Sequence, residues 1–399
     1  MIELAEIEHA ANMIGDQILK TPLAYSPTLS RMFGEEIYLK LENLQKTGSF
    51  KIRGALYKLL LRLDTIGPQG VVAASAGNHA QGVALAARQA NLPATIVMPE
   101  WVSISKQQAT QNYGGHVMIH GQTVGASLAR AEELAKDGRT LIHPFDDNDV
   151  ITGQGTIGLE ILRDLPDVDL IVVPVGGGGL IAGIAAAAKA LKPDVKITGV
   201  QASACPSAYE AMRQQKICRV DTTASIADGI AVQQTGKLTF ALIERLVNEV
   251  VLVEEEHIAA AILMLLERKK TLAEGAGAVP LAALLKGAIP LPRGGKIVLV
   301  ISGGNVDSPL LGRIINQGLL KNSRIMRIRV CLNDTPGSLS RLLVRVANLK
   351  ANVLNIVHDR NVPDLPIHVT RVDLELETRG SDHVRIVYED LQKAGYILE

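Results

Sequence analysis

The sequence predicts an α/β protein with two open, twisted parallel-sheet domains, followed by a smaller C-terminal α+β domain. The first observation is an alternation of strand-like and helix-like segments between residues 36 and 301, which is typical of parallel sheets with helices on both faces. The second is a set of strand-like runs that end in small residues and lead into helix-like runs. The third is a change of character near Leu320, after which the pattern predicts the order βαββαβ.

Composition sets limits on the class of protein. A chain of 399 residues predicts two or three domains, and a hydrophobic content of 47% excludes disorder. The 41 basic residues balance the 41 acidic ones, so neither nucleic acid nor a membrane surface is an expected partner, and the substrate should be small. The three cysteines lack metal-ligand spacing, which predicts reduced thiols and a cytoplasmic location. The histidines show no ligand spacing either, so no metal is expected.

One uncharged run, residues 170–188, is long enough to span a membrane. It contains Pro174 and four adjacent glycines, which would break a helix in lipid. A strand, a loop and a helix explain every residue of the run, so we expect no membrane span. The acidic start of the chain, with Glu3, Glu6 and Glu8, predicts no export signal.

The elements of the first part are expected in chain order. A docking helix covers residues 1–19 and ends at Thr21-Pro22, and a short strand covers residues 36–41. The next elements are a helix from Lys51 to Arg62, a strand at 71–74, a helix at 81–90, a strand at 94–98, a helix at 105–113, a strand at 117–119 and a helix at 124–136. Residues 42–150 therefore form a small open α/β unit inserted in a larger one. The larger unit continues with a helix from Gly153 to Asp164 and strands at 170–175, 196–200, 250–253 and 296–301.

The second part, residues 325–399, is expected to be separate from a catalytic region of residues 1–320. Lys321 and Arg324 mark the linker between them. Val372, Leu374 and Leu376 alternate with acidic residues, which predicts a half-buried strand. Further strands at 325–331, 353–358 and 396–398, with helices at 339–349 and 381–394, complete βαββαβ.

Lys51 is the first candidate functional residue, because it stands among small and apolar residues in the stretch Gly48 to Ala55. Burial lowers the pKa of a lysine and frees its amine to attack a carbonyl. The alternative is a surface lysine whose stem packs on Phe50 while its charge stays in water. The stretch alone does not decide between them.

Three further stretches place a small-residue turn directly after a strand-like run. They are Ser75-Ala76-Gly77-Asn78-His79, Gly176-Gly177-Gly178-Gly179 and Ser302-Gly303-Gly304-Asn305. Backbone N–H groups before a helix bind anions, and glycine lets the backbone approach a phosphate closely. Because open α/β sheets bind ligands at the carboxyl ends of their strands, these turns predict one cleft between the two units.

Together these stretches resemble those of the pyridoxal-phosphate enzymes of fold type II, the tryptophan-synthase β fold, and within them the threonine ammonia-lyases, also called threonine dehydratases. The motifs SFKIRGA, SAGNHAQG, the four-glycine loop and SGGN occur in that family's order and spacing, within residues 1 to about 320. The resemblance implies β-elimination of L-threonine, and of L-serine, to 2-oxobutanoate or pyruvate and ammonia. The implied cofactor is pyridoxal 5'-phosphate.

The resemblance also implies roles for individual residues. Lys51 forms the Schiff base and acts as the catalytic base, Phe50 lies against the cofactor ring, and Asn78 contacts the ring hydroxyl. Ser302 contacts the pyridine nitrogen, where a neutral hydroxyl cannot hold a proton as an aspartate would, and this favours elimination. The phosphate is assigned to Gly176, Gly177, Gly178, Gly179 and Leu180, and the substrate carboxylate to Ser75, Ala76, Gly77, Asn78 and His79. Glu274 either faces the cleft or caps a helix, and both interpretations remain open.

The main alternative is a serine racemase or serine dehydratase, which shares these motifs. Serine racemase carries a second serine where this chain has Ala76, and alanine cannot supply the proton that racemisation needs on the opposite face. Its divalent-metal site corresponds to Gln201, Cys205 and Ser207, which lack carboxylates. A non-enzymatic amino-acid-binding regulator is the alternative from another class, and an intact Lys51 argues against it.

The C-terminal part resembles an ACT domain, an amino-acid-sensing module, and its first loop is matched by residues 334–339. This resemblance implies an amino-acid effector at Asp334, Pro336, Gly337 and Leu339, with the branched-chain amino acids as candidates. It also implies allosteric control and a homo-oligomer, either dimer or tetramer. A place in isoleucine biosynthesis and a catabolic role both remain open. The alternative is a ferredoxin-like dimerisation module without a ligand, because the fold alone fixes no function.

Overall fold

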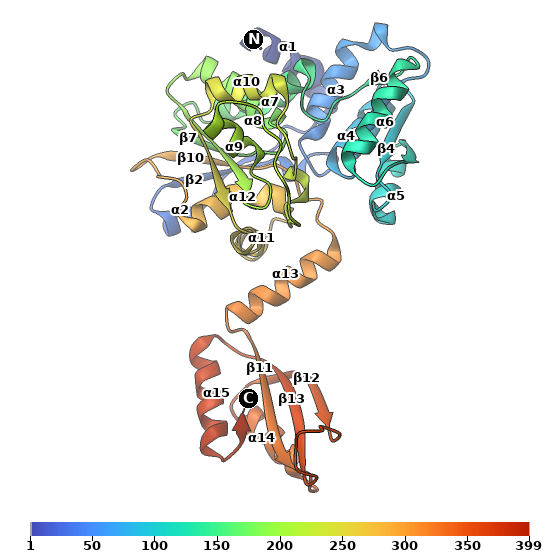
Figure 1. Cartoon of the computed structure of the whole chain (residues 1–399). Coiled ribbons are helices and arrows are strands. Elements are labelled where there is room, and N and C mark those ends of the chain that lie inside the picture. The colour runs from blue at the N-terminus through green and yellow to red at the C-terminus, as the bar shows by residue number, and fades with distance from the viewer. Residues whose placement is uncertain (1, 399) are drawn as a thin grey trace. The chain divides into compact units, whose positions relative to one another are not determined.

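The computed structural model describes residues 2–398, and the chain divides after Asp307 into two compact units (Figure 1). No helix among the described residues is both long enough and apolar enough to cross a membrane. The uncharged run at residues 170–188 is the expected strand, loop and helix: β7 (Leu170–Pro174), a glycine turn, and α8 (Gly179–Leu191).

The larger sheet of the first unit is parallel except for its first strand. In spatial order its strands are β1 (Leu23–Tyr25), β2 (Glu36–Leu41), β10 (Lys296–Ile301), β7, β8 (Lys196–Ala202) and β9 (Glu249–Val253). All five residues of β7 are buried, as expected for a strand covered on both faces. Because β2, β10 and β7 are parallel neighbours, the turns that follow them lie at one edge of the sheet.

Helices cover both faces of this sheet (Figure 1). The helices of the larger part are α1 (Leu4–Ile14), α2 (Pro27–Phe33), α7 (Asn148–Asp164), α8, α9 (Ser207–Gln214), α10 (Lys237–Leu246), α11 (Glu255–Lys269) and α12 (Gly275–Lys286). The 3-10 turns of the first unit are η1 (Gly15–Gln17), η2 (Glu42–Leu44), η3 (Leu63–Thr65) and η4 (Asp228–Ile230). Ile157, Ile181 and Ile184 pack with Val173 and Val298 in one core, which joins α7 and α8 to the strands.

The smaller sheet is fully parallel and lies between two layers of helix. Its strands, in spatial order, are β5 (His116–Ile119), β4 (Ala94–Met98), β3 (Val71–Ala74) and β6 (Thr140–Leu141). Val71 and Ala73 join the core with α3 (Lys51–Leu61) and α4 (Asn78–Gln89), while Val72 and Ala74 join the core with α6 (Val124–Lys136). The period of two along β3 thus explains why its four residues are all buried. Helix α5 (Ile104–Asn112) packs beside β5.

The second unit has the predicted βαββαβ order. Its elements are α13 (Ser308–Lys321), β11 (Ile325–Asn333), α14 (Ser338–Asn348), β12 (Asn352–Asp359), β13 (Val369–Glu377), α15 (Ser381–Lys393) and β14 (Ile397–Leu398). The sheet order is β12-β13-β11-β14, and its strands are antiparallel. Apolar residues of β11 and β13 pack on α14 and α15 through Leu342, Val346, Val387 and Leu391. Helix α13 belongs to this compact unit, so the division falls before the linker expected near Leu320.

Candidate active site

The residues before α3 are tied to the end of β10. The Phe50 N–H donates to the Ser302 carbonyl at 3.2 Å, and Ser49 and Gly303 form an isolated antiparallel bridge. Lys51 is the first residue of α3. The fold therefore brings the lysine stretch beside the SGGN turn, although about 250 residues separate them in the chain.

The Lys51 amine lies in a partly buried position and has few polar neighbours. Its Nζ donates to the Pro144 carbonyl at 2.9 Å and lies 5.2 Å from the centroid of the Phe50 ring. Burial lowers the pKa of Lys51 from 10.5 to about 8, and the nearby Glu274 opposes this shift. A substantial fraction of the amine is therefore neutral just above pH 7, which is the nucleophilic form.

The four-glycine turn lies against the segment that holds Lys51. A side chain at Gly177 would collide with the Phe145 ring, and Gly178 has φ +99°, which favours glycine. The Thr239 hydroxyl donates to the Gly177 carbonyl at 2.7 Å and fixes the turn. No side chain caps α8, so the first N–H groups of this helix remain available to an anion.

The turn at Ser75 to His79 leads into α4, which begins at Asn78. The Gly77 N–H donates to the Ser75 hydroxyl at 3.1 Å, and no side chain caps this helix either. The Asn78 amide donates from Nδ2 to Glu274 Oε1 at 2.7 Å and accepts at Oδ1 from Asn305 Nδ2 at 2.7 Å. Asn78 is therefore held between Glu274, which precedes α12, and Asn305, which follows β10.

His79 carries no charge at neutral pH. It is 3% exposed, and burial, with help from the Lys51 charge, lowers its pKa to about 3. Its Nε2 lies 2.8 Å from the Ile142 carbonyl and so carries the proton, which leaves Nδ1 buried without a partner. The histidine thus ties the turn to Ile142, the residue that follows β6. Because its ring is uncharged, any substrate carboxylate would be held by backbone N–H groups rather than by an imidazolium.

Two of the residues expected at the position of a racemase metal site, Gln201 and Cys205, form hydrogen bonds within the chain. Gln201 accepts at Oε1 from the N–H groups of Ala208 and Tyr209, at 2.8 and 3.0 Å, and so caps the start of α9. The Cys205 thiol donates to the Val232 carbonyl at 3.2 Å, and burial raises its pKa to about 11. Among residues 2–398, no group of three or more His, Cys, Asp or Glu is arranged to hold a metal ion.

The fold and the site are those expected of a protein that binds a phosphate-bearing ligand next to a partly buried amine. Residues 14–303 match the family described as pyridoxal-phosphate dependent enzyme, and the chain belongs to this family. It is 49% identical over 397 residues to an L-threonine ammonia-lyase of Thermotoga maritima, which covers 99% of this chain and 98% of that protein.

Two solved structures resemble the first part of the chain. Maize serine racemase matches with a TM-score of 0.75 and 34% identity, over 80% of this chain and 99% of that one. A T.th. threonine deaminase matches with a TM-score of 0.72 and 39% identity, over 77% of this chain and 99% of that one. Both likenesses confirm the predicted fold class of this region.

The residues present fit pyridoxal phosphate. The glycine turn and the uncapped start of α8 can take a phosphate, and the Lys51 amine can take an aldehyde. The Ser49 hydroxyl, two residues before Lys51, is buried without a partner in this structure, as expected for a pocket that needs a polar ligand. The sequence assigned no role to Asn305, to the Pro144 carbonyl or to Asp146, which caps α10 through the N–H groups of residues 237–239.

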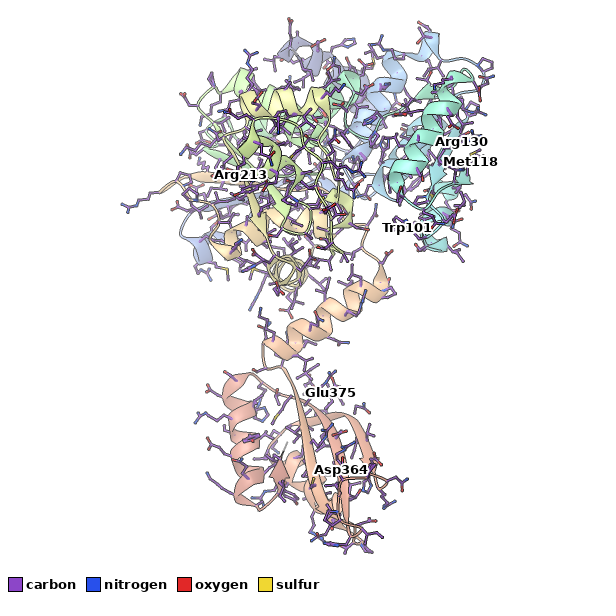
Figure 2. All side chains as sticks on the ribbon, viewed as in Figure 1. Trp101, Met118, Arg130, Arg213, Asp364 and Glu375 are labelled. Atoms are coloured by element: carbon purple, nitrogen blue, oxygen red, sulfur yellow. The ribbon has the colours of Figure 1, made fainter. Side chains whose placement is uncertain are left out.

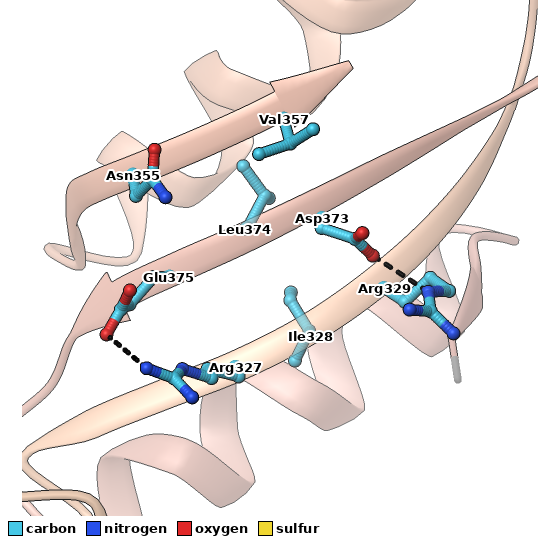
Figure 3. A pocket seen from close by; sticks show the side chains of 8 residues that line it. All are labelled: Arg327, Ile328, Arg329, Asn355, Val357, Asp373, Leu374 and Glu375. Atoms are coloured by element: carbon cyan, nitrogen blue, oxygen red, sulfur yellow. Dashed lines mark hydrogen bonds and ion pairs between the residues drawn. The ribbon is translucent and has the colours of Figure 1, made fainter. Parts of the chain in front are cut away.

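The C-terminal unit carries a separate hollow. A cavity of about 500 Å³ lies on the face of its sheet and is lined by Arg327, Ile328, Arg329, Asn355, Val357, Asp373, Leu374 and Glu375 (Figure 3). Its charges are paired across strands, Arg327 with Glu375 and Arg329 with Asp373. The effector-loop candidates lie elsewhere: Asp334, Pro336 and Gly337 lie between β11 and α14, and Leu339 lies in the first turn of α14. Asp334 pairs there with Arg360, and Gly337 has φ +84°.

Proposed function

We propose that this chain is a threonine ammonia-lyase that converts L-threonine to 2-oxobutanoate and ammonia, and L-serine to pyruvate and ammonia. One observation carries the proposal: the Lys51 amine, whose pKa is about 8, lies beside the glycine turn and the SGGN turn. It donates to Pro144, whose neighbour Phe145 contacts the glycine turn. Phe50, the residue before Lys51, donates to the Ser302 carbonyl. The full-length likeness to an L-threonine ammonia-lyase supports the choice of substrate.

The proposed cofactor contacts follow the turns. The N–H groups of Gly176 to Gly179 and of Leu180 hold the phosphate, Phe50 lies against the ring, Asn78 faces the ring hydroxyl, and Ser302 faces the pyridine nitrogen. When bound, pyridoxal phosphate supplies an aldehyde for the amine and an electron sink that acidifies the Cα hydrogen of an amino acid. The chain supplies position and a base.

Lys51 has two tasks in this proposal. Its Nζ holds the cofactor before substrate arrives, and afterwards it takes the Cα proton of the substrate, because a neutral amine on a short tether is a competent base. The uncapped start of α4, with Ser75, Ala76 and Gly77 before it, orients the substrate carboxylate through backbone N–H groups. The β-hydroxyl group of the substrate takes up one proton and leaves as water, which balances the removal of the Cα proton. The released enamine then tautomerises to the imine, takes up water and loses ammonia in solution.

Product analysis tests the proposal directly. The purified protein, incubated with L-threonine or L-serine, should release equal amounts of ammonia and of 2-oxobutanoate or pyruvate. Chromatography of the 2-oxo acids and an ammonia assay measure both products. Release of neither product from either amino acid would overturn the proposal.

A racemase is the second candidate, because maize serine racemase shares this fold at 34% identity. Ala76 argues against it, since a methyl group cannot deliver a proton to the second face of Cα. We expect little or no D-serine from L-serine in the wild type, and more in Ala76→Ser. Chiral chromatography measures both, and efficient racemisation by the wild type would favour the racemase.

The C-terminal unit is proposed to be an ACT-type regulatory module that binds an amino acid, with isoleucine and valine as first candidates, and joins copies of the chain into a dimer or tetramer. Support comes from its βαββαβ order, from the exposed loop residues Asp334, Pro336 and Gly337, and from Leu339, which follows them in the first turn of α14. A role in isoleucine biosynthesis and a cytoplasmic location complete the proposal. The free thiols of Cys205, Cys218 and Cys331 are consistent with a reducing compartment.

A further inference from the structure

Glu274 is a buried carboxyl group that the helix beside it does not explain. It stands immediately before α12, in the position where a side chain can cap a helix, yet it makes no capping hydrogen bond. Its backbone N–H donates to the Gly303 carbonyl at 3.1 Å, which anchors it beside the SGGN turn. The side chain is 5% exposed and turns instead to Asn78 on α4.

The orientation of the Asn78 amide follows from the bonds around it. Asn305 Nδ2 donates to the Thr47 carbonyl at 2.9 Å, and a carbonyl can only accept, so this end of Asn305 is its NH₂ group. The same nitrogen lies 2.7 Å from the end of Asn78 that must accept. Asn78 Oδ1 therefore faces Asn305, and Asn78 Nδ2 faces Glu274 at 2.7 Å. One Nδ2 hydrogen is used by Glu274, and the second remains for a ligand.

Glu274 accepts the Asn78 hydrogen bond as a neutral carboxyl group. Burial raises its pKa to about 8, and Asp228 of η4 raises it further, while the Asn78 hydrogen bond, Lys106 of α5 and Lys51 of α3 lower it. At pH 7 the carboxyl group holds a proton and still offers one oxygen to Asn78. A neutral acid can thus orient the amide without placing a full negative charge beside the cofactor ring oxygen.

We propose that Glu274 is a positioning residue that acts through Asn78: together with Asn305 it fixes the Asn78 amide so that the remaining Nδ2 hydrogen meets the ring hydroxyl oxygen of the cofactor. The inference rests on the proposed function, because it needs pyridoxal phosphate in the cleft. It assigns Glu274 a role that neither a helix cap nor a substrate ligand would have.

A double-mutant cycle with a binding readout tests this inference. Protein stripped of cofactor is titrated with pyridoxal phosphate, and the visible absorbance gives the Kd and the band position for wild type, Glu274→Ala, Asn78→Ala and the double variant. We expect Glu274→Ala to weaken binding roughly tenfold, about the worth of one hydrogen bond, and to shift the band. In the Asn78→Ala background the same change should have almost no effect.

Two further variants separate positioning from folding. Glu274→Gln should keep near wild-type binding at pH 7, because its amide oxygen can still accept from Asn78. Glu274→Asp should bind as weakly as alanine, because its carboxyl group is one methylene short. Glu254 also stands at the start of a helix without capping it, but its side chain is 43% exposed, so Glu254→Ala is the matched control and should leave the Kd unchanged.

The outcomes discriminate between the two proposals. If Glu274→Ala weakens binding equally in both backgrounds, or if Glu274→Gln binds as weakly as alanine, the positioning role is wrong while the proposed function stands. If the wild type fails to bind pyridoxal phosphate at all, the proposed function fails, and the positioning role fails with it.

Discussion

The Lys51 amine is the residue on which the proposed chemistry depends. Replacement by alanine removes the group that holds the aldehyde, so Lys51→Ala should lose the visible absorbance of the purified protein and lower threonine turnover by roughly two orders of magnitude or more. Absorbance spectra and 2-oxobutanoate assays measure both. Lys46→Ala, five residues earlier and exposed, is the control. Normal turnover in Lys51→Ala would contradict the assignment.

The same amine predicts a pH dependence. Because its pKa is lowered to about 8, the neutral fraction rises steeply between pH 7 and pH 8. The rate at which cofactor-free protein recovers its visible band should therefore rise through this range and level off above about pH 9. Stopped-flow absorbance measures it. A rate that does not change between pH 6.5 and pH 9 would show that the amine titrates outside this range.

Glu274 predicts that the stability of the protein decreases as the pH rises. Its folded-state pKa of about 8 exceeds the ordinary value of 4.5, so its contribution to stability is fully present below pH 4.5 and is lost as the pH rises to about 8. Glu274→Gln lacks this loss. The free energy of unfolding of Glu274→Gln minus that of the wild type should therefore increase with pH. The increase should be at most about 1.4 kcal/mol per pH unit between pH 5 and pH 8, and the difference should then level off. Denaturant melts of cofactor-free protein test this, and a constant difference would be contrary to it.

At the scale of elements, an ion pair joins the smaller sheet region to the larger one. Lys106 of α5 lies 3.2 Å from Asp228 of η4 and 3.6 Å from Asp307, and both carboxylates are more exposed than the lysine. Such partly exposed pairs contribute about 1 kcal/mol or less each, and salt screens them. They can therefore bias the position of α5 without locking it.

Lys106→Met should raise the KM for threonine about two- to fivefold, because α5 is held less firmly beside η4, with little change in kcat. The wild type in 1 M salt should show the same direction of change. Trp101 is the only tryptophan of the chain, stands 59% exposed just before α5 (Figure 2), and gives a fluorescence signal for this helix. Lys136→Met, exposed at the end of α6, is the control. An unchanged KM that is also insensitive to salt would contradict this role of the ion pair.

Buried strands were predicted well, and helix starts less well. The strands at 71–74, 94–98 and 296–301 have the predicted bounds, because each apolar run is followed directly by a serine or a proline. Helix α4 begins at Asn78 rather than at Gln81, because Asn78, His79 and Ala80 are already helical and the backbone leaves helical geometry only at Gly77. Helix α7 begins at Asn148 rather than at Gly153, because Asp147 caps it through the Val150 N–H.

At the scale of the whole molecule, long-range polar contacts explain what the sequence could not show. The chain pattern left the role of Glu274 undecided, because its partner Asn78 lies 196 residues away. Arg53 and Glu42 are both fully buried and form an ion pair, although charged residues in a sequence usually predict the protein surface. The glycine turn and Lys51 were predictable because their chemistry is visible in a few adjacent residues, whereas these networks appear only after folding.

The two compact units predict what truncation does. All the proposed cofactor contacts lie before Asp307, and residues 308–398 have a core of their own. A chain that ends at Asp307 should therefore bind pyridoxal phosphate and keep some activity. It should lose any response to isoleucine or valine and form a smaller oligomer, because an ACT-type sheet offers edges for a second copy.

Titration calorimetry, activity assays with each amino acid and light scattering measure the three properties. A full-length variant separates effector binding from assembly: Gly337→Val places a branched side chain at φ +84°, which should distort the loop while the sheet and its edges remain. We expect this variant to keep the wild-type oligomer and lose the effector response, since an effector can change activity only if it binds two arrangements unequally. A response that survives removal of residues 308–399 would place the regulatory site in the first unit.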